Sequence, residues 1–178
     1  MKLNELTILE YSDLLASKKS VPGGGSALAL VLELACSLGL MVANFTINKK
    51  DYEFCQDEVI DISAKLTKLK EEAHELIDED SLAYQEIIEA YKTGDAIQIS
   101  MASIHGCEVP YRLHMLAKEC EELCEKIEEI GNRNLLSDAR IAKDLCQAIY
   151  PGCKDNIICN VDKITSKEIK DKYLELLK

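Results

Sequence analysis

The sequence predicts an all-α protein, folded as a single-domain bundle of about seven or eight helices around a central apolar helix. Only three prolines interrupt the 178 residues, whereas the helix-forming residues Leu, Ile, Glu and Lys are frequent. Apolar residues make up 47% of the chain and Trp is absent, which indicates a globular protein with an aliphatic core. One long stretch, Ala27 to Ile47, is apolar almost throughout.

Length and charge restrict the classes of protein to consider. A chain of 178 residues fits one domain, which we place at residues 1–178, and it can bury a core without covalent or metal cross-links. The formal net charge of −11 argues against general nucleic-acid binding, which needs a basic surface. A small anionic ligand remains compatible with this charge because local hydrogen-bond donors decide its binding.

An opening helix and a glycine loop precede the central helix. Five leucines at roughly helical spacing predict the opening helix over about residues 3–17. In the loop, Pro22 has a fixed φ, three successive glycines (Gly23, Gly24 and Gly25) are conformationally free, and Ser26 is a good N-cap. Bare backbone beside unpaired helix N–H groups suits a carboxylate, a phosphate or a ligand carbonyl. The alternative is a flexible surface turn.

The apolar stretch that follows has the length of a membrane span, but its composition favours a buried helix. Glu33 lies near its middle, Ser37 and Asn44 are polar, and several small residues allow close helix packing. We interpret it as the central axis of the bundle and expect no membrane insertion. An apolar helix of this kind would also help to form a dimer.

Helical periodicity continues to the carboxyl end. Asp51 is predicted to cap a helix reaching Ile77, and residues 78–81 either end that helix or continue into 82–91. After a turn at 93–95, a helix over 96–130 contains Pro110 and should kink or break there. Helices from 137, over 153–164 and over 166–177 follow, with Pro151 expected to end the first of these.

The eight cysteines do not indicate disulfides. The amino terminus lacks the apolar core of a signal peptide, which predicts a cytoplasmic protein with reduced thiols. Cys120 and Cys124 lie one helical turn apart, but the spacings typical of zinc sites are missing. Buried free thiols, rather than a metal site, are therefore expected.

A set of short motifs resembles the cyclodeaminase/cyclohydrolase family, whose members act on one-carbon units carried by tetrahydrofolate. The family pattern has P-G-G-G-S, then M-V-A-N-L-T, then D-x-x-A-F/Y. The matching segments here are Val21–Ser26, Met41–Thr46, Lys49–Tyr52, Asp80–Tyr84, Val109–Pro110, Gly131–Asn132, Ser137–Asp138, Asn156–Ile157 and Asn160–Val161. They cover nearly the whole chain in the family's order.

The resemblance implies a folate enzyme. Its reaction would be elimination of ammonia from 5-formiminotetrahydrofolate, or hydration of 5,10-methenyltetrahydrofolate to the 10-formyl form. It implies acid/base catalysis by Asp80, whose pKa burial in a pocket would raise. Substrate binding is implied for Pro22, Gly23, Gly24, Gly25, Ser26, Asn44 and Tyr84. A homodimer is implied as well, and no cofactor is expected beyond the tetrahydrofolate substrate, because both reactions need only proton transfers.

One departure from the family pattern leaves other functions open. Where the family carries L-P-K, this chain has a shorter segment ending in Lys92–Asp95, without the proline. A folate-binding or structural helical protein that has lost turnover is therefore the alternative, and a helical interaction protein without a ligand is a third hypothesis. The sequence does not choose between deaminase and hydrolase, nor between a cleft within one subunit and one between two.

Overall fold

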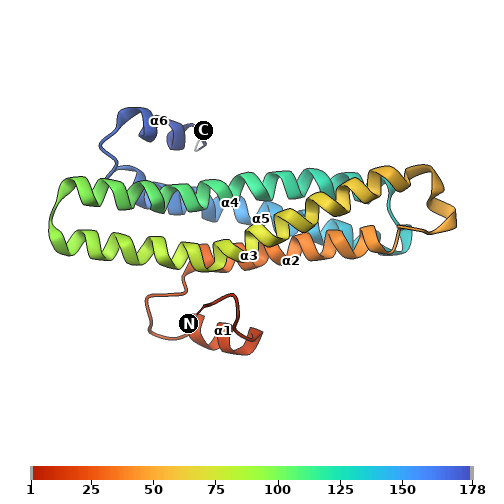
Figure 1. Ribbon diagram of the computed structural model, residues 1–178, viewed down its shortest axis with the longest axis horizontal. Helices are drawn as coiled ribbons and strands as arrows, with labels where there is room; N and C mark the ends of the chain where they lie inside the picture. Colours follow the sequence, from red (N-terminus) through yellow and green to blue (C-terminus); the bar gives the residue numbers. More distant parts are fainter. Residues whose placement is uncertain (1, 177–178) are drawn as a thin grey trace.

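A computed structural model describes residues 2–176, and all regular secondary structure among them is helical. Figure 1 labels the six α-helices of this part of the chain. They are α1 (Ile8–Leu15), α2 (Gly24–Asn44), α3 (Gln56–Thr93), α4 (Ala96–Ile130), α5 (Leu136–Val161) and α6 (Lys167–Leu176). Two short 3₁₀ helices, η1 (Lys50–Cys55) and η2 (Arg133–Leu135), lie in turns. The all-α prediction is confirmed, and Leu177, the end of the last predicted helix, lies outside the described residues.

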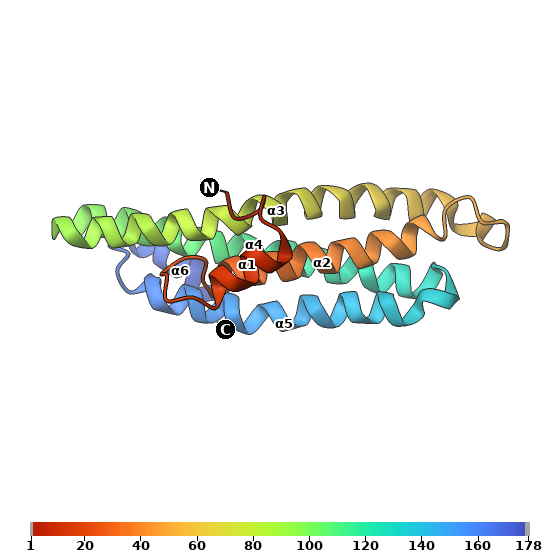
Figure 2. The same ribbon diagram turned by 90° about the horizontal axis from the view of Figure 1, so that it is seen from below.

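The four long helices α2, α3, α4 and α5 form an antiparallel bundle in which consecutive helices are joined at alternate ends (Figure 1). α1 and α6 lie outside this bundle. α1 crosses α2 (Figure 2), whereas α6 packs near α4 and α5. The predicted opening helix is shorter than expected, since Thr7 caps α1 through a capping box with Glu10.

The apolar helix α2 is the central axis, as predicted. Its inner face consists of small and aliphatic residues, and Leu32, Ala35 and Cys36 are fully buried. At Gly39 an added Cβ would lie 2.9 Å from Leu66 Cδ1 and 3.1 Å from Cys124 Sγ, so α2 approaches its neighbours closely there. By length and composition α2 also qualifies as a membrane span, but it packs against α3, α4 and α5.

Fewer helices occur than the seven or eight predicted, because two pairs of predicted helices are continuous. The acidic residues 78–81 lie inside α3, and α5 runs through Pro151 to Val161. The expectation that Pro151 ends a helix was wrong. Proline removes the bond to the carbonyl four residues earlier, here Gln147, and both residues are exposed, so water can satisfy that carbonyl. Asp51 also does not cap α3, because η1 intervenes and α3 begins at Gln56.

Pro110 lies inside a continuous α4, whose bounds match the prediction; of the expected kink or break, the break does not occur. The carbonyl that Pro110 leaves without a helical partner belongs to Gly106. Asn160 of α5 donates its side-chain Nδ2 to this carbonyl oxygen at 3.2 Å. A hydrogen bond from the neighbouring helix thus replaces the one that proline removes.

Several of the motif residues lie at the end of the bundle that holds η1 and η2. Asn132 donates its backbone N–H to the buried Thr46 hydroxyl at 2.9 Å and its side-chain Nδ2 to the Phe45 carbonyl at 3.1 Å. Thr46 in turn donates to the Val42 carbonyl. These residues therefore join the end of α2 to the turn before α5, and their role is structural.

Seven of the eight cysteines are buried, and Cys159 alone is exposed. In the core, the sulfur atoms of Cys36 and Cys120 lie 3.5 Å apart, and those of Cys120 and Cys124 lie 3.9 Å apart. All are free thiols. No group of three or more His, Cys, Asp or Glu side chains within residues 2–176 is arranged to hold a metal ion.

Candidate active site

A pocket of about 340 Å³ lies where the loop before α2 meets α3, α4 and α5. The loop contributes Gly23, the first turn of α2 contributes Gly24 and Gly25, and α3 contributes Asp80 and Tyr84. The structure thus brings together the glycine loop and the carboxylate, which are 55 residues apart in the sequence (Gly25 to Asp80).

Asp80 is held by the first turn of α2. The backbone N–H of Ser26 donates to Asp80 Oδ2 at 2.8 Å. This N–H is one of the donors that a helix N-terminus leaves without an intrahelical partner, and the helix dipole adds a favourable interaction with an anion. Burial raises the pKa of Asp80 above its ordinary value, and the Ser26 hydrogen bond offsets part of that rise.

Gly25 is the residue that allows this contact. It is buried, and a Cβ built on it would overlap the Asp80 carboxylate, with Oδ1 as the nearest atom. A Cβ at Gly23 or Gly24 would meet nothing within 4 Å. Only the third glycine is therefore required for steric reasons, whereas the first two leave the pocket wall bare.

Ser26 differs from its predicted role. The N-cap of α2 is Gly23, because Gly24 and Gly25 already belong to the helix. Ser26 is fully buried inside the first turn, and its hydroxyl donates to the Ile77 carbonyl of α3 at 2.8 Å. The residue therefore lies behind Asp80 rather than on the pocket surface, and only its backbone N–H faces the carboxylate.

Asn160 and Gly106 form the opposite wall. Asn160 Nδ2 donates to the carbonyls of Gly106 and Asn156, both at 3.2 Å, so its two N–H bonds are used. Its Oδ1 remains an acceptor on a residue that lines the pocket. A Cβ at Gly106 would lie 2.5 Å from Ile87 Cδ1 of α3 and 3.1 Å from Asn160 Nδ2 of α5, so α4 approaches both neighbouring helices closely at this point.

The electrostatic character of the pocket is simple. Asp80 is the charged residue among the described lining residues, which include no Lys, Arg or His. Ala83, Ile87 and Val109 supply apolar walls, and Tyr84, 42% exposed, lies at the opening. Such a pocket suits a flat, largely apolar ligand that carries positive charge or N–H donors next to the carboxylate.

Besides Ser26, two predicted site residues do not lie on this surface. Asn44 ends α2, roughly 30 Å from the glycine loop at 1.5 Å per residue, and lines a separate groove with Glu33 and His74. Asn44 does not line this pocket, because α2 is long and Asn44 lies at its far end. Pro22 is buried beside the loop but is not among the lining residues. Lys92 lies near the turn before α4 and pairs with Glu89.

Sequence reasoning missed Ile87, Gly106 and Cys159, which also line the pocket. The one available signal was Pro110, since a proline inside a helix frees the carbonyl of Gly106. The other two positions carry ordinary helix residues, and only the packing of α3, α4 and α5 brings them to the pocket.

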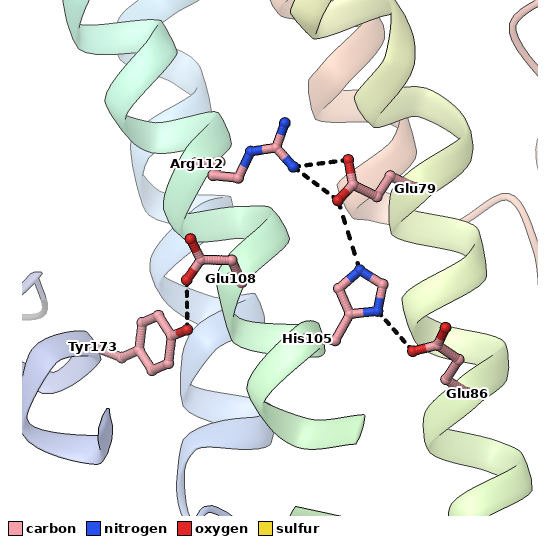
Figure 3. Close-up of polar contacts among 6 residues, drawn as sticks. All are labelled: Glu79, Glu86, His105, Glu108, Arg112 and Tyr173. Atoms are coloured by element: carbon pink, nitrogen blue, oxygen red, sulfur yellow. Dashed lines mark hydrogen bonds and ion pairs between the residues drawn. The ribbon is translucent and has the colours of Figure 1, made fainter. Parts of the chain in front are cut away.

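A surface network of charges lies beside the pocket, on the outer side of α3 and α4 (Figure 3). Arg112 binds both carboxylate oxygens of Glu79, at 2.8 and 2.9 Å, and His105 lies between Glu79 and Glu86. Tyr173 of α6 donates to Glu108 at 2.6 Å. These pairs join α3, α4 and α6. His105 takes part by linking α4 to Glu79 and Glu86 of α3 at the surface.

Fold and pocket together define an all-α protein that presents a single carboxylate, held at a helix N-terminus, to a small molecule. The family described as formiminotransferase-cyclodeaminase matches residues 7–178, and the chain belongs to this family. The family suggested by the sequence motifs is therefore confirmed.

Individual relatives agree with this assignment. The chain is 28% identical to a methenyltetrahydrofolate cyclohydrolase of Methylorubrum extorquens, over 96% of this chain and 86% of that protein. It is 22% identical to the formimidoyltransferase-cyclodeaminase of Gallus gallus, but spans only 31% of that longer protein. The crystal structure of formiminotetrahydrofolate cyclodeaminase from Thermotoga maritima superimposes with a TM-score of 0.94 and 32% identity, over 99% of this chain and 88% of that one.

The contact between Gly25 and Asp80 predicts different effects of alanine at adjacent glycines. Gly25→Ala should destabilise the protein by about 1–3 kcal/mol, because its Cβ forces Asp80 or α2 to move. Gly24→Ala should be nearly neutral, because its Cβ meets open space. Urea unfolding of both variants measures the difference. Equal free energies of unfolding would contradict the close approach.

The raised pKa of Asp80 predicts a pH-dependent effect of Asp80→Asn on stability. Since the folded pKa exceeds the unfolded one, wild-type stability is lost as pH rises from the ordinary Asp range through the folded pKa. Asparagine cannot ionise, yet its Oδ1 can still accept from Ser26. The melting temperature of the variant, relative to that of the wild type, should therefore rise as pH increases over this range. A gain that shrinks with rising pH would mean that the ionised carboxylate is the favoured form.

Proposed function

We propose that this chain makes and breaks C–N bonds at the one-carbon bridge of tetrahydrofolate, as a methenyltetrahydrofolate cyclohydrolase or a formiminotetrahydrofolate cyclodeaminase. The observation that carries the proposal is the Asp80 carboxylate, half-buried, bonded to the Ser26 N–H and facing the pocket. Relatives of both names, one of them covered over 86% of its length, support the same substrate class.

In the hydrolase reaction, water adds to the carbon that joins N5 and N10. Asp80, ionised at the start, accepts a proton from this water and then donates it to N5 as the C–N5 bond breaks. The hydroxyl proton of the tetrahedral intermediate leaves to solvent as the formyl C=O forms on N10. The balance is methenyltetrahydrofolate cation plus water giving 10-formyltetrahydrofolate plus a proton.

In the deaminase reaction, N10 takes the place of water. It attacks the protonated formimino carbon on N5, and Asp80 accepts the N10 proton. The same carboxyl then donates this proton to the amino nitrogen, which leaves as ammonia while the methenyl cation forms. Both reactions thus need one group that acts as base and then as acid, with its pKa raised toward neutrality.

The charge distribution of the pocket supports both reactions. The N5–C–N10 bridge is a delocalised cation in the methenyl form, and Asp80 is the charge that faces it. The pterin and benzoyl rings fit apolar walls such as Ile87, Val109 and Tyr84. Asn160 Oδ1 is an acceptor for a substrate N–H, and the bare backbone of Gly23 and Gly24 allows close approach.

Additions and eliminations of this kind transfer protons but no electrons. We therefore expect no cofactor beyond the tetrahydrofolate derivative itself and no resident metal. The cytoplasm is the compartment we propose, because the chemistry uses a soluble folate and the thiols are free. We expect no nucleic-acid or membrane partner.

We also propose a homodimer formed through the outer face of α2. This face remains apolar although the inner face is buried, with Leu34 50% exposed and Phe45, just after the helix, 61% exposed. An exposed apolar helix face of this kind is typical of an interface. The pocket lies at the amino-terminal end of α2, at Gly24 and Gly25, ahead of Leu34 and Phe45.

Absorbance of the methenyl form tests the function. Purified protein is mixed with methenyltetrahydrofolate, where hydrolysis removes the band, or with formiminotetrahydrofolate, where deamination creates it. Asp80→Asn should slow the active reaction by about 10²–10⁴-fold. Glu79→Gln is the control, since Glu79 is adjacent in sequence but binds Arg112 outside the pocket. Folate binding without turnover in the wild type would favour the non-catalytic folate-binding alternative.

Sedimentation velocity tests the dimer. Leu34→Lys should convert a dimer to a monomer, because it places a charge in the apolar interface. Ile97→Lys is the matched control, since Ile97 is 71% exposed on α4 rather than on α2. A wild-type protein that sediments as a monomer at tens of micromolar, or a Leu34→Lys variant that remains dimeric, would contradict this assignment.

A further inference from the structure

Tyr11, on the short helix α1, connects to Asp80 through Ser26. The Tyr11 hydroxyl lies 2.9 Å from Ser26 Oγ, and both residues are buried. Ser26 Oγ uses its own proton to bond the Ile77 carbonyl at 2.8 Å. Tyr11 must therefore be the donor and Ser26 the acceptor. This chain of hydrogen bonds runs from Tyr11 of α1 through Ser26 of α2 to Ile77 of α3. Ile77 precedes Asp80 by three residues.

We propose that Tyr11 is a positioning residue for Asp80, acting by fixing the Ser26 residue whose backbone N–H binds the carboxylate. The proposal rests on the proposed function for its catalytic consequence. Ser26 is the third residue of α2, where the helix is held by few bonds of its own. Its side-chain contacts to Tyr11 and Ile77 determine where the N–H points.

The segment that carries Tyr11 is itself attached to α3. Asp78 Oδ1 accepts from the Leu3 N–H at 2.7 Å, and Asn4 Nδ2 donates to the His74 carbonyl at 3.2 Å. Leu3 is buried and belongs to the main core cluster. The amino-terminal segment thus contacts α3 before Asp80 and reaches α2 through Tyr11, with α1 lying across α2 (Figure 2).

Few titratable groups face Asp80. The effect of a Tyr11 substitution on the pKa of Asp80 can therefore be measured with little contribution from other groups. From α1 comes Tyr11, whose pKa is raised mainly by burial, which keeps it a neutral donor. From α5 come Cys153, whose pKa is raised to about 12, and Cys159, and from α3 itself Tyr84. The described lining residues of α2 and α4, such as Gly25 and Val109, do not titrate.

Tyr11→Phe removes the hydroxyl but keeps the ring in the core. Ser26 then loses one of its two side-chain partners, and its N–H aligns less well with Asp80 Oδ2. Because that hydrogen bond favours the ionised carboxyl, weakening it should raise the pKa of Asp80 further, by about half a unit to one unit. A misaligned base should lower kcat by about three- to tenfold and leave KM nearly unchanged.

The experiment is a titration of the Asp80 carboxyl by ¹³C NMR in the full chain without substrate, with the resonance assigned by its loss in Asp80→Asn. Turnover of the methenyl or formimino substrate is measured beside it. Tyr173→Phe is the matched control, because it also removes a buried phenol that donates to a partner, Glu108, outside the pocket. The control should lower the melting temperature without moving the Asp80 titration.

A double variant tests the route through Ser26. In a Ser26→Ala background, Tyr11→Phe should no longer shift the pKa of Asp80, because its partner is gone. An equal shift in both backgrounds would overturn the connection, and so would an unchanged Asp80 pKa in Tyr11→Phe alone. Wild-type protein that turns over neither folate would refute the proposed function, while the NMR titration would still decide whether Tyr11 positions Asp80.

Discussion

The crossing of α2 and α3 at Gly25 is the contact on which the rest of the candidate site depends. Asp80 can accept the Ser26 N–H at 2.8 Å only because residue 25 has no side chain to occupy the same space. The long apolar α2 and the continuous α3 are packed so that this approach is maintained. The first turn of a central helix thereby becomes a binding site for a carboxylate.

The Ser26 N–H bond stabilises the ionised Asp80 carboxylate, which burial disfavours. Burial raises the pKa of Asp80, so the ionised form costs free energy that the single N–H bond only partly offsets. The remainder of the bundle, with close packing at Gly39 and the Thr46–Asn132 bonds at the far end, offsets that cost. The motifs that resemble the family pattern fall into two groups. One lies around the pocket, and the other lies at the far end of the bundle, near the Thr46–Asn132 bonds.

Local sequence patterns predicted the fold class and the full extent of α4, and the family resemblance implied that the glycine loop and Asp80 share a site. They failed where a contact between helices decides the outcome. Pro110 does not break α4 because Asn160 supplies the missing donor, and Ser26 is not a cap because Ile77 and Tyr11 bind its hydroxyl. Asn44 lies at the opposite end of α2 from the glycine loop, a separation that motif order does not report. No periodicity indicates that α1 reaches the site.

The most direct test of the account is the wild-type pH–rate profile, compared with the pKa of Asp80 measured independently by NMR in the same protein. If Asp80 is the base that begins the reaction, kcat/KM should fall on the acid side, with an apparent pKa that coincides with the measured one and lies above the ordinary Asp range. A profile that is flat through the Asp80 titration, or that falls at a different pH, would contradict the assignment.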